Sequence, residues 1–75
     1  PRSESEAAGF LILDEAILHL QRVNERAATV VRLRYFAGLS VEETAQAMGV
    51  SDATVKRAWA FARGWLKDAI ESASE

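Results

Sequence analysis

The chain has 75 residues, no cysteine and one histidine, and its formal net charge at pH 7 is −2. A chain of this length forms at most one domain, and without cysteine it has neither a disulfide framework nor a cysteine zinc site. No apolar run approaches the roughly 20 residues that span a bilayer, and no signal-peptide pattern occurs, so we expect a cytoplasmic domain. The acidic balance argues against a generally basic nucleic-acid binder.

The first helical pattern begins near Phe10. Residues 1–8 are small and polar and lack apolar periodicity, so we expect a flexible lead or chain edge there. From Phe10 onward an apolar residue recurs every three or four positions, which predicts a helix with one buried face. That face comprises Leu13, Ala16, Ile17 and Leu20. His19 lies off this stripe and is expected to face solvent without a functional role.

A second helix is predicted from Glu25 to Ala37. Asn24 is a good N-cap for it, and Gly38 supplies its C-terminal stop. Its apolar face is expected to comprise Val30, Leu33 and either Phe36 or Ala37, with Val31 and Tyr35 beside it. Three arginines fall elsewhere on this helix, and they are Arg26, Arg32 and Arg34. They form either a solvated cationic face or, for Arg32 or Arg34, a contact to a phosphate beside the motif that follows.

That motif opens with the signals of a short, well-capped helix. Ser40 precedes the helix-compatible run Val41–Met48, and Glu43 lies three residues after Ser40, which is the spacing of a capping box. Gly49 can take the left-handed conformation that ends the helix. The expected buried face comprises Val41, Thr44, Ala45 and Met48.

A further helix is predicted almost immediately, because Ser51 can cap a start near Asp52. Two capped helices joined by a three- or four-residue turn predict a helix-turn-helix, with Val50 filling the core between them. The inward face of the last helix is expected to comprise Val55, Ala58, Trp59, Ala62, Leu66, Ala69 and Ile70. We therefore expect an all-α fold, a compact four-helix domain over residues 9–72 with a long C-terminal recognition helix, and a frayed tail over residues 73–75.

The start of this last helix carries the candidate recognition residues. In a helix-turn-helix this end meets base edges in the major groove. Lysine and arginine suit guanine O6 and N7, and serine hydroxyls and helix N-termini suit phosphate. Threonine can donate or accept a hydrogen bond at a base edge, or place its methyl group against thymine. The predicted DNA-contacting residues are Ser51, Asp52, Ala53, Thr54, Lys56 and Arg57. Asp52 either only favours the helix dipole or accepts from cytosine N4.

The segment from Val30 to Leu66 resembles region 4 of bacterial sigma factors, especially the extracytoplasmic-function group. The matching runs are RLRYF at Arg32–Phe36, GLS at Gly38–Ser40, EETAQAMG at Glu42–Gly49, TVKR at Thr54–Arg57 and AR at Ala62–Arg63. The resemblance implies a domain that reads the −35 promoter element and touches the RNA polymerase β flap, with a promoter-melting region 2 upstream of Pro1. It also implies that Arg34 contacts the DNA backbone, and it leaves an anti-sigma protein open as a further partner.

Phe61 and Trp65 depart from the pattern of that family, in which arginine or another polar residue is common at these positions. Four residues apart, they share one face of the last helix beyond its inward stripe. Either they add core against the first helix, or they form a contact surface for the polymerase flap, an anti-sigma protein or a second copy. Full burial of both rings would exclude the contact surface.

Three classes of function stay open at this point. The leading hypothesis is promoter recognition by a sigma factor, with selective loss of sequence preference expected in Arg57→Ala or Lys56→Ala. The second is the DNA-binding effector domain of a response-regulator or quorum-type transcription factor, and the third is a pure interaction module without DNA affinity. An enzyme is not expected, because the sequence has no paired carboxylates, nucleophile with a base, or phosphate-cradling glycine-rich loop. No metal or cofactor site is expected either.

Overall fold

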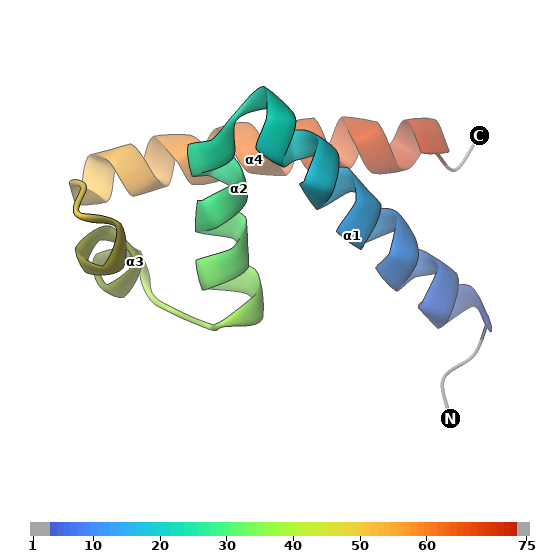
Figure 1. Ribbon diagram of the computed structural model, residues 1–75, viewed down its shortest axis with the longest axis horizontal. Helices are drawn as coiled ribbons and strands as arrows, with labels where there is room; N and C mark the ends of the chain where they lie inside the picture. Colours follow the sequence, from blue (N-terminus) through green and yellow to red (C-terminus); the bar gives the residue numbers. More distant parts are fainter. Residues whose placement is uncertain (1–3, 74–75) are drawn as a thin grey trace.

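The computed structural model describes residues 4–73, with side chains from residue 12 to residue 72, and most of this part of the chain is helical (Figure 1). Its elements are α1 (Glu4–Val23), α2 (Glu25–Val31), the π-helical turn η1 (Arg32–Phe36), α3 (Val41–Met48) and α4 (Asp52–Ala73). The predicted all-α fold with four helices is therefore confirmed. None of these helices has the length and apolarity that crossing a bilayer requires.

Both ends of the helical region reach further than expected. α1 begins at Glu4, well before Phe10, so part of the expected lead over residues 1–8 is helical. Apolar periodicity reports only helical turns that bury one face, so it does not locate a helix start among small polar residues. α4 continues to Ala73, one residue into the tail expected to fray. The predictions for residues 1–3 and 74–75 lie outside the described part of the chain.

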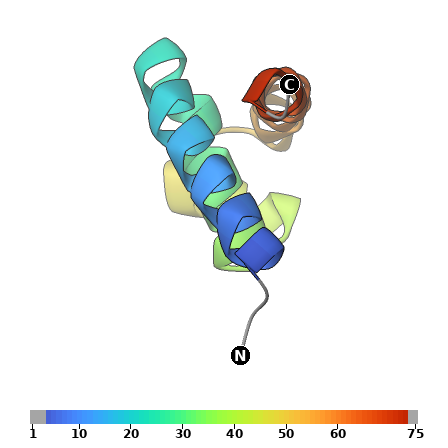
Figure 2. The ribbon, with the colours of Figure 1, turned by 90° about the vertical axis from the view of Figure 1, so that its right-hand side faces the viewer.

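α4 forms the long axis of the molecule, and the other helices pack against it (Figure 1). α3 lies beside the N-terminal end of α4, and α2 crosses near its middle. Viewed almost along α4, α1 runs obliquely on one side of it (Figure 2). α1 and α2 also contact each other, so α1, α2 and α4 enclose one part of the core.

The core consists of two clusters that share one tryptophan. One joins α1, α2 and α4, and its buried members are Ala16, Ile17, Leu20, Ala27, Ala28, Val31, Ala62 and Leu66. The other joins α2, α3 and α4, and its buried members are Val30, Ala45, Val55 and Ala58. Trp59 packs against both clusters, so it couples the helix-turn-helix to the supporting helices. The inward faces predicted for the first, third and last helices are confirmed.

The second predicted helix changes character after Val31. Its last turn is the π turn η1, in which the Ala37 N–H donates to the Arg32 carbonyl five residues back at 3.1 Å. This spacing is one residue wider than in an α-helix, so later side chains move around the axis. Tyr35 and Phe36 are consequently 60% and 53% exposed. The expectation that Phe36 or Ala37 completes a buried face was wrong.

One buried hydroxyl in the smaller cluster yields a stability prediction. Thr44 is fully buried, and its Oγ1 has no hydrogen-bond partner among the described residues. Thr44→Val is therefore expected to raise the free energy of unfolding by about 1 kcal/mol, because it removes an unsatisfied polar group while keeping the side-chain shape. Urea denaturation followed by circular dichroism measures the change.

Thr29 is the matched control for this substitution. Its Oγ1 donates to the Glu25 carbonyl oxygen at 3.0 Å, so Thr29→Val removes a hydrogen bond that exists and is not expected to stabilise the fold. A lower free energy of unfolding in Thr44→Val than in the wild type would contradict the prediction.

Candidate nucleic-acid interface

The first helix of the motif starts as the capping box requires. The backbone N–H of Glu43 donates to Ser40 Oγ at 3.0 Å, and the backbone N–H of Ser40 donates to Glu43 Oε1 at 2.9 Å. Two N–H groups that the helix itself cannot satisfy are thereby paired. The start of α3 is therefore defined locally, by Ser40 and Glu43, which are three positions apart.

The turn between α3 and α4 depends on a left-handed glycine. Gly49 has φ 69° and ψ 35°, and the N–H of Val50 donates to the Ala45 carbonyl at 3.0 Å. A Cβ at Gly49 would meet no atom within 4 Å, so the backbone conformation, not space, favours glycine there. Val50 packs against the cluster of Val55 and Ala45, as predicted, so the turn is held to the core.

The front of α4 combines one buried anchor with an exposed surface. Val55 is fully buried and holds this part of the helix against α3. The predicted recognition residues around it are exposed, except for half-buried Thr54, and they are Ser51, Asp52, Ala53, Thr54, Lys56 and Arg57. The structure therefore brings this predicted set together on one helix end, where it is accessible to a ligand.

Three of these side chains are linked by hydrogen bonds. Ser51 Oγ accepts from the backbone N–H of Thr54 at 3.2 Å, as an N-cap does, and lies 3.0 Å from Thr54 Oγ1. Arg57 Nη2 donates to Thr54 Oγ1 at 3.4 Å. Arg57 is thereby drawn back towards the helix start. Lys56 has no hydrogen-bond or ion-pair partner among the described residues, so its ammonium group is available to a ligand.

Arg34 lies apart from this set and has an internal role. It is half-buried, its Nε donates to the Leu39 carbonyl at 3.4 Å, and its guanidinium carbon lies 5.2 Å from the Trp59 ring centroid. These contacts tie η1 to α4 and to the loop before α3. Arg32, the other residue proposed to reach phosphate, donates from Nη2 to Gln21 Oε1 at 2.7 Å.

Arg26 is the basic residue that sequence reasoning left as a solvated side chain. The structure places it in a hollow of about 250 Å³ lined by Asn24, Arg26, Thr54, Arg57, Ala58 and Phe61. The start of α2 thus meets the front of α4, although the two lie almost thirty positions apart in the chain. No spacing rule in the sequence reports this neighbourhood, because it depends on how α2 crosses α4.

The two aromatic residues that depart from the family pattern have different environments. Phe61 is 44% exposed and lines the hollow beside Arg57. Trp65 is half-buried and packs against the cluster that joins α1, α2 and α4. Trp65 therefore adds core, as one hypothesis held, and the rings are not both fully buried, so the contact-surface hypothesis survives for Phe61.

A second hollow is mostly apolar and also has two basic lining residues. Its volume is about 350 Å³, and it is lined by Leu13, Val31, Tyr35, Trp59, Leu66 and Ile70, with Arg63 and Lys67 from α4. The exposed Tyr35 ring meets Phe36 edge-on at a centroid distance of 5.1 Å. The π turn therefore adds aromatic surface at one end of this groove.

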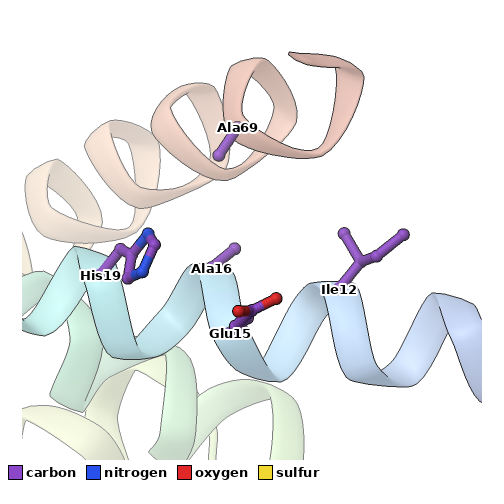
Figure 3. Close-up of a pocket in the computed structure, with 5 residues that line it drawn as sticks. All are labelled: Ile12, Glu15, Ala16, His19 and Ala69. Atoms are coloured by element: carbon purple, nitrogen blue, oxygen red, sulfur yellow. The ribbon is translucent and has the colours of Figure 1, made fainter. Parts of the chain in front are cut away.

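His19 is exposed, as predicted, and lies in a shallow hollow of about 140 Å³ between α1 and α4 (Figure 3). The other residues lining it are Ile12, Glu15, Ala16 and Ala69. Within residues 12–72 no three His, Cys, Asp or Glu side chains are grouped in a way that could hold a metal ion. His19 and Glu15 alone supply too few ligands for such a site.

The capping box gives α3 a dependence on pH. The pKa of Glu43 lies below its ordinary value of 4.5, first because the Ser40 backbone N–H bonds to the carboxylate and second because of the Ser40 hydroxyl. A lowered pKa in the folded state means that ionised Glu43 stabilises the fold above pH 4.5 and that this contribution is lost as pH falls through the folded pKa.

Glu43→Gln is therefore expected to be less stable than the wild type at neutral pH and to approach it as the solution is acidified below pH 4.5. Thermal unfolding of both proteins across this pH range measures how far the difference in stability between them decreases. Glu42→Gln, in the same first turn, is the control. If the stability difference between Glu42→Gln and the wild type decreases equally on acidification, the helix dipole and not the capping box accounts for the pH dependence.

Comparison with known proteins identifies the family. The family model described as ECF sigma factor matches residues 3–72, which is nearly the whole chain. No curated protein and no solved structure matches the chain. ECF sigma factors are DNA-binding factors of transcription initiation and are not catalysts, and the helix-turn-helix described above is consistent with that role. This chain belongs to the ECF sigma factor family.

Proposed function

We propose that the chain recognises the −35 element of promoters as the C-terminal domain of a sigma factor and thereby directs transcription initiation. The observation that carries the proposal is the front of α4. Its first turns are exposed around the fully buried Val55, behind a turn that Gly49 and the capping box hold in place. This is the arrangement in which the second helix of a helix-turn-helix enters the major groove.

Some residues of this surface suit contacts to bases, and others suit contacts to phosphates. Lys56 suits guanine O6 and N7, and Asp52 and Ala53 precede it at the tip of the helix, where cytosine N4 or a thymine methyl would be read. Ser51 and the helix N-terminus suit a phosphate. Arg34 remains a candidate for a backbone contact through the guanidinium nitrogens that its bond to Leu39 leaves free.

The low charge of the chain shapes this function. Its net charge is −2, so the chain as a whole gains no long-range attraction to DNA, and its affinity for isolated DNA is expected to be weak. Binding to promoter DNA as part of the RNA polymerase assembly overcomes this limit, because tethering raises the effective concentration of the domain at the promoter.

The apolar groove between α1, η1 and α4 supports the polymerase contact. An apolar floor with Arg63 and Lys67 at its edge suits an amphipathic helix that carries acidic residues beside its apolar stripe. We assign the groove to the β flap of RNA polymerase, with an anti-sigma protein as the competing occupant. Because Trp59 lines the groove, titration with the isolated flap is expected to change tryptophan fluorescence. Unchanged fluorescence at saturating flap would contradict the assignment.

The DNA proposal is tested with the wild-type chain alone. Duplexes that bind are selected from a random pool, and fluorescence anisotropy then compares the selected duplex with a scrambled duplex of equal length. The selected duplex is expected to bind more tightly, and both affinities are expected to fall as salt rises. Equal affinity for the two duplexes at every salt concentration would exclude promoter reading.

The other two hypotheses are distinguished by the same data and by the family. The match to the ECF sigma factor model over residues 3–72 favours a sigma factor over a response-regulator or quorum-type effector domain. Such an effector would select palindromic duplexes and bind them as a dimer. A pure interaction module would bind neither duplex, even at low salt.

A further inference from the structure

The hollow between the start of α2 and the front of α4 collects cationic and hydrogen-bonding groups from separate elements. Arg26 lies at the second position of α2, and Arg57 lies in the second turn of α4, yet both line the same space of about 250 Å³. Thr54 contributes a hydroxyl. Asn24, whose Oδ1 accepts from the Ala27 N–H at 3.1 Å, contributes an amide whose Nδ2 group is still able to donate.

The charges around this hollow are of one sign. No carboxylate is among its lining residues. Glu25, the neighbour of Arg26 in the chain, lines a different hollow with Leu18, Gln21 and Arg22. Arg26 is exposed and has no hydrogen-bond or ion-pair partner among the described residues. Two guanidinium groups on one concavity without a compensating carboxylate repel each other, and a bound anion relieves that repulsion.

The residues in and beside the hollow indicate which kind of anion it would bind. Phe61, 44% exposed, forms part of its wall, so an apolar surface lies beside the arginines. A nucleic-acid backbone offers this combination, since each phosphate is followed by a sugar that can pack on a ring. The hollow also adjoins the exposed front of α4, because Thr54 and Arg57 belong to both.

We propose that this hollow binds one backbone phosphate of duplex DNA, held by Arg26 and Arg57, with Phe61 packed on the adjoining sugar. The proposal rests on the DNA-binding function proposed above and deepens it. It gives Arg57 a different task from the base contact expected from sequence: Arg57 holds the backbone, and base reading rests with Lys56. Arg26 becomes a DNA-contacting residue that positions α4 on the duplex.

Arg26→Ala tests the proposal, measured by fluorescence anisotropy on the selected and the scrambled duplex between about 50 and about 200 mM salt. Removing one phosphate contact is expected to weaken both duplexes by the same factor and to reduce the slope of log affinity against log salt by about 1. Arg57→Ala is expected to act in the same way. Arg26→Lys is expected to retain most of the slope, because the charge remains.

The matched control is Arg22→Ala, which removes an exposed arginine that lines the separate hollow beside Glu25. An Arg26→Ala slope and affinity indistinguishable from those of Arg22→Ala would overturn the proposal. A loss confined to the selected duplex would also overturn it, since that pattern marks a base contact. Circular dichroism of each variant separates loss of binding from loss of fold.

The two proposals fail in distinguishable ways. If the wild type binds both duplexes equally but Arg26→Ala still lowers the slope, promoter reading is excluded and the phosphate site stands. If the wild type prefers the selected duplex but Arg26→Ala changes nothing, promoter reading stands and the phosphate site is excluded. If the wild type binds no duplex at low salt, both are excluded.

Discussion

Leu20→Ala is expected to lower the free energy of unfolding by about 2 to 5 kcal/mol. Leu20 is fully buried near the end of α1 and belongs to the cluster that joins α1 to α2 and α4. Alanine would leave a cavity that the small residues around it, Ala16, Ala27 and Ala62, cannot fill. Since domains are stable by about 5 to 15 kcal/mol in total, a large share of the fold's stability is at stake.

Urea denaturation followed by circular dichroism measures this loss, with Leu18→Ala as the control. Leu18 lies on the same helix and is 51% exposed, so its truncation is expected to change the free energy of unfolding by less than about 0.5 kcal/mol. Both variants remove the same atoms from the same helix, so the difference between them reports burial alone. Equal losses in the two variants would contradict the packing of α1 on α2 and α4.

Lys56→Ala is expected to reduce the preference for the selected duplex over the scrambled duplex by about 1 to 3 kcal/mol. The reason is that the Lys56 ammonium is exposed one residue after the buried Val55 and has no partner among the described residues. Since a tenfold change corresponds to about 1.4 kcal/mol, the expected loss of preference lies between about 5-fold and about 140-fold. Fluorescence anisotropy on both duplexes measures it.

Lys67→Ala is the charge-matched control. Lys67 is exposed on the same helix but lies beside the apolar groove, about three turns beyond Lys56. Both substitutions remove one positive charge, so a general electrostatic effect would weaken binding equally. The assignment of base reading to Lys56 is contradicted if Lys56→Ala weakens both duplexes by one factor, as a phosphate contact would. In that case Lys56 and Arg57 share the backbone task.

The elements that could be predicted are those whose signals are local. The capping box of Ser40 and Glu43, the N-cap of Asn24 and the left-handed Gly49 all involve residues within four positions of each other. Their hydrogen bonds form whenever that stretch is helical, whatever lies around it. The exposed front of α4 followed in the same way, because a helix that buries Val55 must turn its neighbours outward.

The end of α2 could not be predicted on this basis. Its π turn exposes Tyr35 and Phe36 and coincides with the stacking of Arg34 on Trp59, a residue on another helix. Three- and four-residue periodicity assumes an unbroken α-helix, so a wider turn shifts every later side chain away from its expected face. The internal contacts of Arg32 with Gln21 and of Arg34 with Leu39 and Trp59 were likewise not predicted, because each joins segments that no local spacing relates.

The sequence by itself determined the order of the helices, the caps at Asn24, Ser40 and Gly49, the buried stripes of the first, third and last helices, and the family, because each depends on residues close together in the chain or on a pattern that extends along it. Only the tertiary structure decided which separate segments meet. The crossing of α2 over α4 brings Arg26 to the hollow that Arg57 and Phe61 line, and Trp59 packs against both core clusters. Contacts of this kind depend on the angles and positions at which the helices pack. Helix packing is a property of the whole fold, and no local spacing in the sequence encodes it.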